Sequence, residues 1–369
     1  MTTAEPRPIG LYLHVPFCKV KCLYCDFYSM PAGEETKDAY ARALCRAIDA
    51  ADPLCDTVYF GGGTPSQLGT VRLTAILAHI RRTADCEVTV ECNPGDAAAL
   101  DFRALAAAGV NRISMGLQSA DDAERRALGR RSDAATVRRA VEQVQTAGIA
   151  NLSLDLMLGI PGQTAESLAR SIDFCLALDV PHVSAYLLKV EDGTPFAAMQ
   201  EQLALPQEDA VCDFYLQTVD ALAAAGLRQY EISNFARPGC ESRHNLKYWR
   251  CEAYLGLGPA AHSFLDGKRF YYPRDLQAFL DGTPPIPDGP GGDPEEWLML
   301  RLRLMEGVTD AAFAARFGAG LPDAFWETAA RFARQGLMTV ADGCAALTPT
   351  GCLLSNQIIG ALLQTVAQA

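Results

Sequence analysis

The sequence has no long hydrophobic run. Near the start of the chain, the apolar stretch covers only residues 11–15 before Pro16 interrupts it, and residues 1–10 are mostly polar. A membrane-spanning helix needs about 20 consecutive apolar residues, and a secretory signal peptide needs a positively charged start followed by an apolar core. We therefore expect neither a transmembrane segment nor an export signal.

Positive charge is also scarce. The chain has 32 lysine and arginine residues against 44 aspartate and glutamate residues, which gives a formal net charge of -12. This is the wrong sign for a protein that neutralises many phosphates, so nucleic acid is not an expected partner. Disorder is excluded as well, because 49% of the residues are hydrophobic and only 21% are charged.

Cysteine, in contrast, is abundant, with 13 residues. Without an export signal these thiols should be kept reduced in the cytosol, so we expect a cytoplasmic protein in which closely spaced cysteines serve a metal site or catalysis. Cys45, Cys86, Cys92 and Cys240 lack such spacing and are expected to be small apolar residues of the core.

Short β-branched and apolar runs alternate with longer stretches of helical period, which is the pattern of repeated βα units. With right-handed crossovers, six such units predict an α/β fold based on an open, partial (β/α)6 barrel, whereas a full eight-unit barrel is not visible. Strands are expected at residues 11–15, 57–60, 87–91, 112–115, 151–157 and 182–188. Helices are expected at residues 36–51, 71–82, 97–108, 133–147 and 165–178.

Composition divides the chain into two parts. Residues 1–280 hold the six units, a helix at 207–225 and a stretch rich in glycine and aromatic residues. Residues 281–294 are expected to be a linker, because nine of these fourteen residues are proline or glycine and exclude a helix or a central strand. Residues 295–369 predict three helices, two short strands at 337–340 and 344–347, and a last helix from Pro349. This order resembles a small winged-helix α+β domain, and with few clustered cations it is expected to be a structural or docking module.

Three cysteines lie close together in HVPFCKVKCLYCDF, on the loop after the first expected strand: Cys18, Cys22 and Cys25. At this spacing each thiolate can bind one iron of a 4Fe-4S cluster, which leaves the fourth iron open. A ferredoxin would supply a fourth cysteine, and structural zinc would need a fourth protein ligand, yet no cysteine or histidine follows before Cys45. A zinc site or three incidental buried thiols are the alternatives.

The CxxxCxxC motif after a first strand resembles the signature of the radical S-adenosylmethionine (SAM) superfamily. The resemblance continues in LYLHVPFC, VYFGGGTPS, VECNPGD, GVNRISMGLQS, SLDLMLGIPGQT, YEISNFARPG, HNLKYW and GLGPAAHS, and so covers nearly the whole chain. The sequence is similar to the group that contains the oxygen-independent coproporphyrinogen III oxidases and the HemW-type haem chaperones. This resemblance implies that the amino and carboxylate groups of SAM chelate the open iron.

The glycine triplet Gly61, Gly62 and Gly63 directly follows the second expected strand, with Thr64 after it. Without Cβ atoms the backbone can approach a ligand closely, and the resemblance implies that this loop meets the amino group of SAM. Carboxylates near the C-terminal ends of barrel strands face the active-site mouth. By resemblance, the remaining SAM contacts are Tyr12, Tyr24, Glu91, Gln118, Arg130, Asp155, Lys189 and His262.

Arg130 has an alternative role as a solvated surface cation, because its neighbour Arg131 is equally available. The resemblance also implies the chemistry: a low-potential cluster delivers one electron to the sulfonium of SAM, a carbon-sulfur bond breaks, and a 5'-deoxyadenosyl radical forms in a dry site. The electron donor would be a low-potential protein such as a flavodoxin or ferredoxin. A second substrate is expected over Tyr186, Lys189 and His262 at the barrel mouth.

Two departures distinguish the close relatives. The oxidases carry another cysteine where this chain has Phe27, and they have a long N-terminal extension, whereas 17 residues precede Cys18 here. Both features favour a haem chaperone that delivers haem to acceptor haemoproteins, and the alternative is an oxygen-independent coproporphyrinogen III oxidase. A radical enzyme that modifies nucleic acid is disfavoured by the acidic charge balance.

The HNLKYW sequence is the expected haem site. The neutral imidazole of His244 can bind haem iron, and Tyr248 and Trp249 can stack on a porphyrin face. The alternative is a hydrogen-bonded histidine that fixes a loop, with both aromatic residues in the core, since most histidines are not ligands. His14 is expected to orient the cluster loop. His79 and His182 are expected to be structural.

Overall fold

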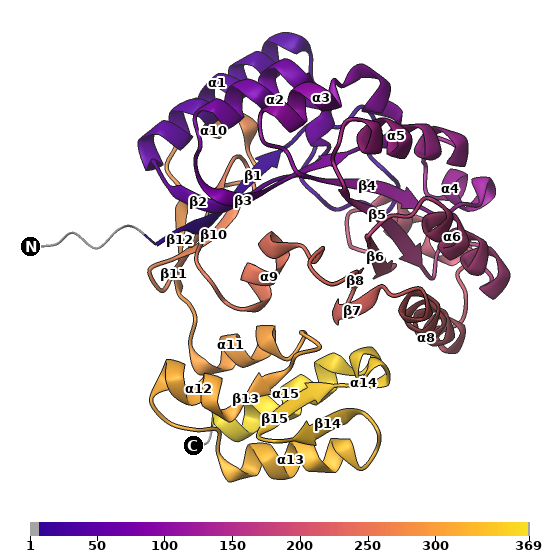
Figure 1. The fold of residues 1–369 in the computed structure, drawn as a ribbon, viewed down its shortest axis with the longest axis vertical. Coiled ribbons are helices and arrows are strands. Elements are labelled where there is room, and N and C mark those ends of the chain that lie inside the picture. Colours follow the sequence, from indigo (N-terminus) through magenta and orange to yellow (C-terminus); the bar gives the residue numbers. More distant parts are fainter. Residues whose placement is uncertain (1–6, 368–369) are drawn as a thin grey trace, which may run out of the picture.

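A computed structural model describes residues 7–367 of the chain (Figure 1). Six strands follow one another along the sequence: β1 (Ile9–Val15), β2 (Leu54–Gly62), β3 (Arg81–Cys92), β4 (Arg112–Gln118), β5 (Asn151–Leu158) and β6 (His182–Leu187). Each pairs in parallel with the next. Parallel neighbours need a crossover between them, which explains the alternation of strand and helix patterns in the sequence.

Helices cover the outer, convex side of this curved sheet (Figure 1). They are α1 (Glu34–Ala51), α2 (Gly69–Ala78), α3 (Phe102–Ala107), α4 (Asp122–Ala127), α5 (Ala134–Thr146), α6 (Ala165–Ala177) and α8 (Glu208–Ala224). The concave side faces the barrel interior. The fold is thus the predicted α/β partial barrel.

Side chains alternate along β1 between the two sides of the sheet. Leu11, Leu13 and Val15 have no exposed surface and join the core beneath the helices. Tyr12 and His14 point the other way, into the interior, where Tyr12 packs near Tyr59 of β2. The barrel interior is therefore lined by polar and aromatic residues, while the apolar core lies between sheet and helices.

Two helix predictions were wrong in their boundaries. Residues 81–82 begin strand β3, where Arg81 and Arg82 pair with the start of β2, and the preceding helix ends at Ala78. The expected helix at 97–108 is instead a 3-10 helix, η2 (Pro94–Ala99), followed by α3. The break occurs because the Asp101 side chain accepts a hydrogen bond from the Ala104 amide and so caps a new helix.

Six short strands extend the sheet on both sides: β7 (Arg228–Glu231), β8 (Asn234–Ala236), β9 (Tyr254–Leu257), β10 (His262–Leu265), β11 (Lys268–Tyr271) and β12 (Ile286–Pro290). The whole sheet has the order β12-β11-β10-β9-β1-β2-β3-β4-β5-β6-β8-β7. The sequence did not predict these strands, because runs of three to five residues carry little periodicity.

The expected linker contains one of these strands. Residues 286–290 form β12, which pairs with β11 at the edge of the sheet. Proline cannot donate to a strand ladder, so a proline-rich segment is tolerated at an edge but not in the centre. The division of the chain into domains at residues 281–294 remains a prediction.

The C-terminal part lies below the barrel in Figure 1. Its elements are α11 (Pro294–Arg301), β13 (Val308–Thr309), α12 (Asp310–Phe317), α13 (Asp323–Ala333), β14 (Met338–Ala341), β15 (Cys344–Leu347), α14 (Pro349–Leu353) and α15 (Ser355–Val366). The three strands form a small antiparallel sheet in the order β13-β15-β14. The predicted hairpin is present, whereas the predicted last helix is divided into two.

The remaining helices are α7 (Pro195–Ala198), α9 (Arg243–Trp249), α10 (Leu276–Leu280) and the 3-10 helices η1 (Pro65–Leu68) and η3 (Gln200–Gln202). Of these, α9 lies on the concave side of the sheet and contacts both β2 and α11 (Figure 1). It therefore stands between the barrel interior and the C-terminal part. Among the described residues, no helix is long and apolar enough to cross a membrane.

Candidate functional site

The cysteine loop follows β1 and is fixed at several points by the backbone. The Cys18 amide donates to the Met30 carbonyl at 3.0 Å, and the Leu23 amide donates to the Leu128 carbonyl at 3.3 Å. On its other side, Leu23 accepts from the amide of Phe196 at 3.0 Å. Backbone hydrogen bonds thus attach the cysteine loop to the segment around Met30, to the end of α4 and to α7.

The three thiols of this loop are available as metal ligands. Cys18, Cys22 and Cys25 are half-buried and free, and burial together with the nearby Cys22 thiol raises the pKa of the Cys25 thiol. Within residues 7–367, no three histidine, cysteine, aspartate or glutamate side chains converge on one metal ion. In a 4Fe-4S cluster each thiolate binds a different iron atom, so three free thiols on one loop supply ligands for three of the four irons.

The glycine loop after β2 packs directly against the cysteine loop. The amides of Gly63 and Thr64 donate to the carbonyls of Val15 and Phe17, each at 2.8 Å. Gly62 has a φ of 105°, and a Cβ atom on it would lie 2.7 Å from the His14 ring. Only glycine fits both the conformation and the space.

Gly61 faces the interior rather than the cysteine loop. A Cβ atom on it would lie 2.9 Å from the ring of Tyr59, 3.0 Å from that of Tyr12 and 3.2 Å from Glu91 Oε1. Gly61 therefore lies against Tyr12 and Glu91, two of the residues predicted to contact SAM. A side chain at Gly61 would have to displace them, whereas one at Gly62 would have to displace His14.

Two carboxylates line the interior near the strand ends. Glu91 accepts a hydrogen bond from the Tyr59 hydroxyl at 2.8 Å, and Asp155 accepts one from Ser114 at 3.2 Å. Burial raises the pKa of Glu91 to about 7 and that of Asp155 to about 6, although the nearby Arg112 opposes both shifts. Glu91 lies next to the end of β3 and Asp155 lies within β5, and their role in binding SAM remains a prediction.

Arg130 points into the site rather than into solvent. Its Nη2 atom donates to the Tyr24 hydroxyl at 3.3 Å, and its Nη1 atom donates to the Gly116 carbonyl at 3.5 Å. Arg131, in contrast, is exposed. The buried Gln118 lies nearby, with its side-chain nitrogen also close to Gly116. The structure thus brings Tyr24, Gln118 and Arg130 together on one side of the mouth.

Lys189 and His262 lie farther out. The Lys189 side chain is 78% exposed and pairs with Glu191 at 2.8 Å. His262 is exposed and stacks on Tyr271, with ring centroids 5.2 Å apart. Tyr186, at the end of β6, is 41% exposed. These three residues therefore border the mouth on its solvent side instead of lining its enclosed part.

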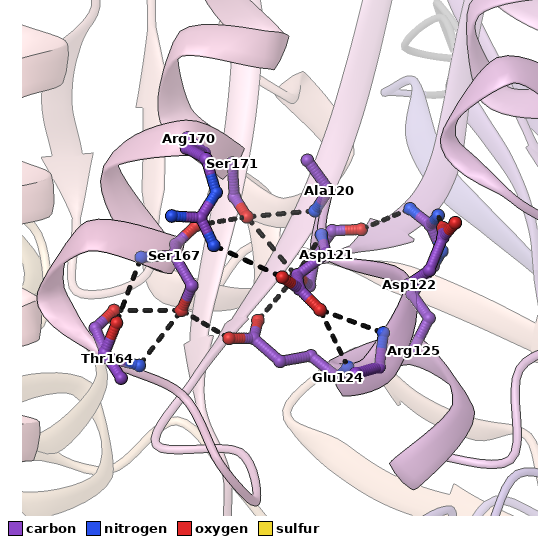
Figure 2. Close-up of polar contacts among 11 residues, drawn as sticks. Ala120, Asp121, Asp122, Glu124, Arg125, Thr164, Ser167, Arg170 and Ser171 are labelled. Atoms are coloured by element: carbon purple, nitrogen blue, oxygen red, sulfur yellow. Dashed lines mark hydrogen bonds and ion pairs between the residues drawn. The ribbon is translucent and has the colours of Figure 1, made fainter.

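A buried polar network behind the mouth fixes the turn after β4 (Figure 2). The Glu124 carboxylate accepts hydrogen bonds from the hydroxyls of Ser119, at 2.6 Å, and Ser167. The Ser171 hydroxyl accepts from the Ala120 amide at 2.9 Å. These contacts attach the segment that leads from Gln118 to Arg130 to helix α6. Sequence reasoning missed the network, because its hydroxyls come from residues that are distant in the sequence.

The HNLKYW segment forms α9, at the opposite end of the interior from the cysteines. The amides of Arg243 and His244 both donate to the Glu87 carboxylate at 3.0 Å. Glu87 and its register partner Thr57 lie four residues before Glu91 and Gly61, which are near the ends of β3 and β2. Helix α9 therefore closes the floor of the barrel, while the cysteines lie at its mouth.

His244 has no exposed surface, and both of its ring nitrogens have partners. Nδ1 lies 2.8 Å from the Thr57 hydroxyl, and Nε2 lies 2.8 Å from the Tyr248 hydroxyl. Burial, aided by the nearby charges of Lys247 and Arg112, lowers the pKa of His244 to about 3. This arrangement fits the alternative role of a structural histidine. Binding to haem iron would require one of the two hydrogen bonds to break.

The aromatic residues of α9 are likewise engaged. The Tyr248 ring packs edge-on against Tyr254, with centroids 4.5 Å apart, and the Arg303 guanidinium lies over the Trp249 ring at 5.9 Å. The expected porphyrin-stacking surface is therefore occupied by contacts within the chain. The other histidines behave as expected: His182 is fully buried between Ser153 and Tyr230, and His79 pairs with Asp49.

Comparisons with known proteins identify the family of this chain. The radical SAM superfamily model matches residues 12–175, and the HemN C-terminal domain model matches residues 293–354. The chain is 35% identical over 372 residues to "Heme chaperone HemW" of Bacillus subtilis, covering 95% of this chain and 98% of that protein. The chain belongs to the HemW family of radical SAM proteins. HemW of Escherichia coli is 36% identical over 329 residues, covering 84% of this chain and 86% of that protein.

A solved structure supports the fold of this HemW family member. The coproporphyrinogen III oxidase HemN of Escherichia coli, described as a radical SAM enzyme, superimposes with a TM-score of 0.82. The match covers 98% of this chain and 91% of that chain, at 21% sequence identity. At this identity the likeness shows a shared fold, including the C-terminal part, and leaves the function to other observations.

Proposed function

We propose that this protein is a haem chaperone, which binds haem and delivers it to acceptor haemoproteins without oxidising coproporphyrinogen III. The observation that carries the proposal is the near full-length likeness to proteins named heme chaperone in several bacteria. Phe27 supports it, since the oxidases have a cysteine at this position by the resemblance described above. The alternative function, an oxygen-independent coproporphyrinogen III oxidase, has in its favour the fold that the chain shares with HemN.

Within this proposal, Cys18, Cys22 and Cys25 hold a 4Fe-4S cluster, and the glycine loop and interior side chains hold SAM. A SAM-bound cluster of this kind supplies reductive cleavage of SAM. The residues of this chain orient the cofactor: Gly61 leaves room beside Glu91, while Arg130 presents a guanidinium at the mouth. An arginine there is suited to a carboxylate, because its planar fork donates two parallel hydrogen bonds.

Haem is proposed to dock at the mouth rather than on α9. Four large apolar side chains on the cysteine loop and at the end of β6 are exposed: Val20 by 49%, Phe27 by 63%, Tyr186 by 41% and Leu187 by 42%. Exposed apolar groups gathered around one opening are typical of a binding surface. Haem is planar and mostly apolar, so an open surface of this kind could bind it and still release it to another protein.

The proposed function also implies partners and a cellular location for this protein. A low-potential flavodoxin or ferredoxin is proposed as the electron donor for the cluster, and haemoproteins that lack haem as the acceptors. The cytoplasm is the proposed location, since all thirteen cysteines are free thiols and a reducing compartment maintains them in that state.

The deciding experiment combines a binding assay with a product assay under anaerobic conditions. The reconstituted protein should shift the Soret band of added haem and transfer that haem to an apo-haemoprotein. It should form no porphyrin product from coproporphyrinogen III in the presence of SAM and a strong reductant. SAM-dependent release of carbon dioxide from coproporphyrinogen III would overturn the chaperone function and favour the oxidase.

A further inference from the structure

His262, the first residue of β10, differs from the other four histidines of the chain. Each of those has a ring nitrogen within hydrogen-bond distance of a neighbour: His14, His79, His182 and His244. His262 is exposed, and within residues 7–367 the structure shows no hydrogen bond to either of its ring nitrogens. An imidazole of this kind can bind an incoming ligand without first breaking a contact within the chain.

A tyrosine on the neighbouring strand orients the His262 ring. Tyr271 of β11 is the register partner of His262, and the two rings stack with an angle of 22° between their planes. Ile286 of β12 is in turn the register partner of Tyr271 and is 42% exposed. Register partners of antiparallel strands project from the same face of a sheet. The three side chains therefore form a row that offers a ring nitrogen beside an aromatic and an aliphatic group.

This row lies on the concave side of the sheet, at the mouth. Phe264 follows His262 by two residues on β10, so both side chains project from the same face. The register partner of Phe264 is Tyr254, whose ring packs against Tyr248 of α9 on the concave side. Strand β9 is parallel to β1, and β10 is antiparallel to β9. The first residue of β10 therefore lies at the strand ends that open to the mouth.

The segment after β11 connects His262 to the cysteine loop. The Tyr272 amide donates to the carbonyl of the residue before His262 at 2.9 Å. Two residues farther on, Arg274 forms an ion pair with Asp26 at 3.5 Å, and Asp26 directly precedes the exposed Phe27. His262 and Phe27 therefore lie on the same side of the mouth, and Arg274 is close to both.

The charges around His262 suit an apolar ligand that carries carboxylates. Burial of part of the ring lowers the pKa of His262, an effect that Asp288 opposes and that Arg269 and Arg274 enhance. The imidazole is therefore neutral at pH 7 and has a free electron pair. Arg269 is held by Glu296 at 2.5 Å, whereas the Arg274 side chain is 60% exposed and makes only the long ion pair described above. Arg274 can therefore turn to a carboxylate of a bound ligand.

We propose that His262 is the residue that binds the iron of haem at the mouth. The assignment rests on the proposed function and replaces His244, whose two ring nitrogens are occupied. One ring nitrogen of His262 donates its electron pair to the iron, with no change in oxidation state. Tyr271 orients the imidazole, Ile286 offers an apolar neighbour to the macrocycle, and Arg274 is suited to a propionate. The SAM contact that the resemblance implies for His262 is the other role that the experiment distinguishes.

The experiment compares His262→Ala and His262→Tyr with His79→Ala, a control at an exposed histidine on the outer side of the barrel. Each reconstituted protein is titrated with ferric haem, and the position of the Soret band is recorded. The wild type and His79→Ala should give the same band. His262→Ala should displace the band and weaken haem binding at least about tenfold, as expected for the loss of one direct bond to iron. His262→Tyr should give the spectrum of a phenolate-bound haem, since tyrosine is itself a haem ligand.

Two further measurements separate iron binding from a structural effect. Free imidazole added to haem-bound His262→Ala should restore the wild-type Soret position, because it replaces the missing ligand. A band that imidazole leaves displaced would contradict the assignment. The melting temperature of the ligand-free His262→Ala protein should lie within about 3 °C of the wild-type value, since an exposed side chain contributes little to stability.

Equilibrium dialysis with SAM completes the comparison. Unchanged SAM affinity in His262→Ala, together with a displaced Soret band, supports the haem ligand. Reduced SAM affinity with an unchanged Soret band assigns His262 to the SAM site and overturns the proposal. If the wild type binds haem and His262→Ala matches it in Soret position and affinity, the ligand assignment fails while the chaperone function stands. If the wild type binds no haem, the chaperone function fails and the ligand assignment fails with it.

Discussion

The Sγ atom of Cys18 lies 3.1 Å from the hydroxyl oxygen of Thr64. The cysteine loop therefore contacts the glycine loop through one predicted cluster ligand and one predicted SAM contact. The amides of Gly63 and Thr64 also donate to the carbonyls of Val15 and Phe17. The loops after β1 and β2 therefore form one rigid unit. Cluster binding and SAM binding are expected to depend on the same backbone.

Replacing any one of Cys18, Cys22 or Cys25 by alanine should abolish the brown absorbance and most of the iron after anaerobic reconstitution, since each thiolate is assigned to a different iron atom. Cys45→Ala, at a half-buried thiol on helix α1, is the matched control and should retain both. Iron and absorbance are measured on the same samples. A single-cysteine variant that kept four irons would contradict the assignment.

Gly62→Ala should weaken SAM binding by an order of magnitude or more, because the new Cβ would lie 2.7 Å from the His14 ring at a φ of 105°. Gly33→Ala is a suitable control, since its Cβ would meet nothing within 4 Å. Equilibrium dialysis measures SAM, and iron analysis shows whether the cluster persists. Normal SAM affinity in Gly62→Ala would mean that the loop is only a turn.

Stability should depend on pH through Glu91. Because burial raises its pKa to about 7 in the folded protein, above the value of 4.5 expected when unfolded, the folded state holds this proton more tightly. Its contribution to stability is therefore complete below pH 4.5 and is lost as pH rises through about 7, by at most about 3 kcal/mol. Urea unfolding of the ligand-free protein at several pH values should show a smaller fall for Glu91→Gln than for the wild type. An unchanged slope would contradict the shift, and the exposed Glu35→Gln serves as control.

His244→Ala should lower the free energy of unfolding by roughly 2 to 4 kcal/mol, because it leaves a cavity and removes partners from Thr57 and Tyr248. His79→Ala, at an exposed ion pair, should change it by less than about 1 kcal/mol. In the folded fraction of His244→Ala, the Soret band of bound haem should keep its wild-type position. A displaced band would restore His244 as a candidate haem ligand.

Phe27→Ser should weaken haem binding while changing stability by less than about 0.5 kcal/mol, because the side chain is 63% exposed at the mouth. Val71→Ser is the matched control: Val71 is 81% exposed on helix α2, on the outer side of the barrel, and its replacement should leave haem binding unchanged. Soret titrations and urea unfolding of both variants give the comparison. Equal haem affinity in Phe27→Ser and the wild type would remove the mouth as the docking surface.

The sequence alone determined the parts of the fold that repeat. Six parallel strands and most of their helices followed from alternating patterns, because each βα unit carries its own hydrophobic period. The cysteine loop and the glycine loop were also visible, since each is a local motif after a strand. The sequence did not show that these loops contact each other through Cys18 and Thr64. That contact depends on the tertiary structure, in which neighbouring parallel strands bring the two strand ends together.

Tertiary structure alone decided the roles of the interior residues. The HNLKYW motif predicts His244 as a ligand of haem iron. In the structure, however, α9 lies at the floor of the barrel, where Thr57 and Tyr248 form hydrogen bonds with both ring nitrogens of His244. Arg130 shows the reverse: its neighbour Arg131 is equally available in the sequence, yet Arg131 is exposed while Arg130 points into the site and donates to the Tyr24 hydroxyl. The physical reason is the same in both cases. Whether a polar side chain is satisfied or free to bind a ligand depends on partners supplied by distant segments of the chain, and only the folded sheet brings those partners together.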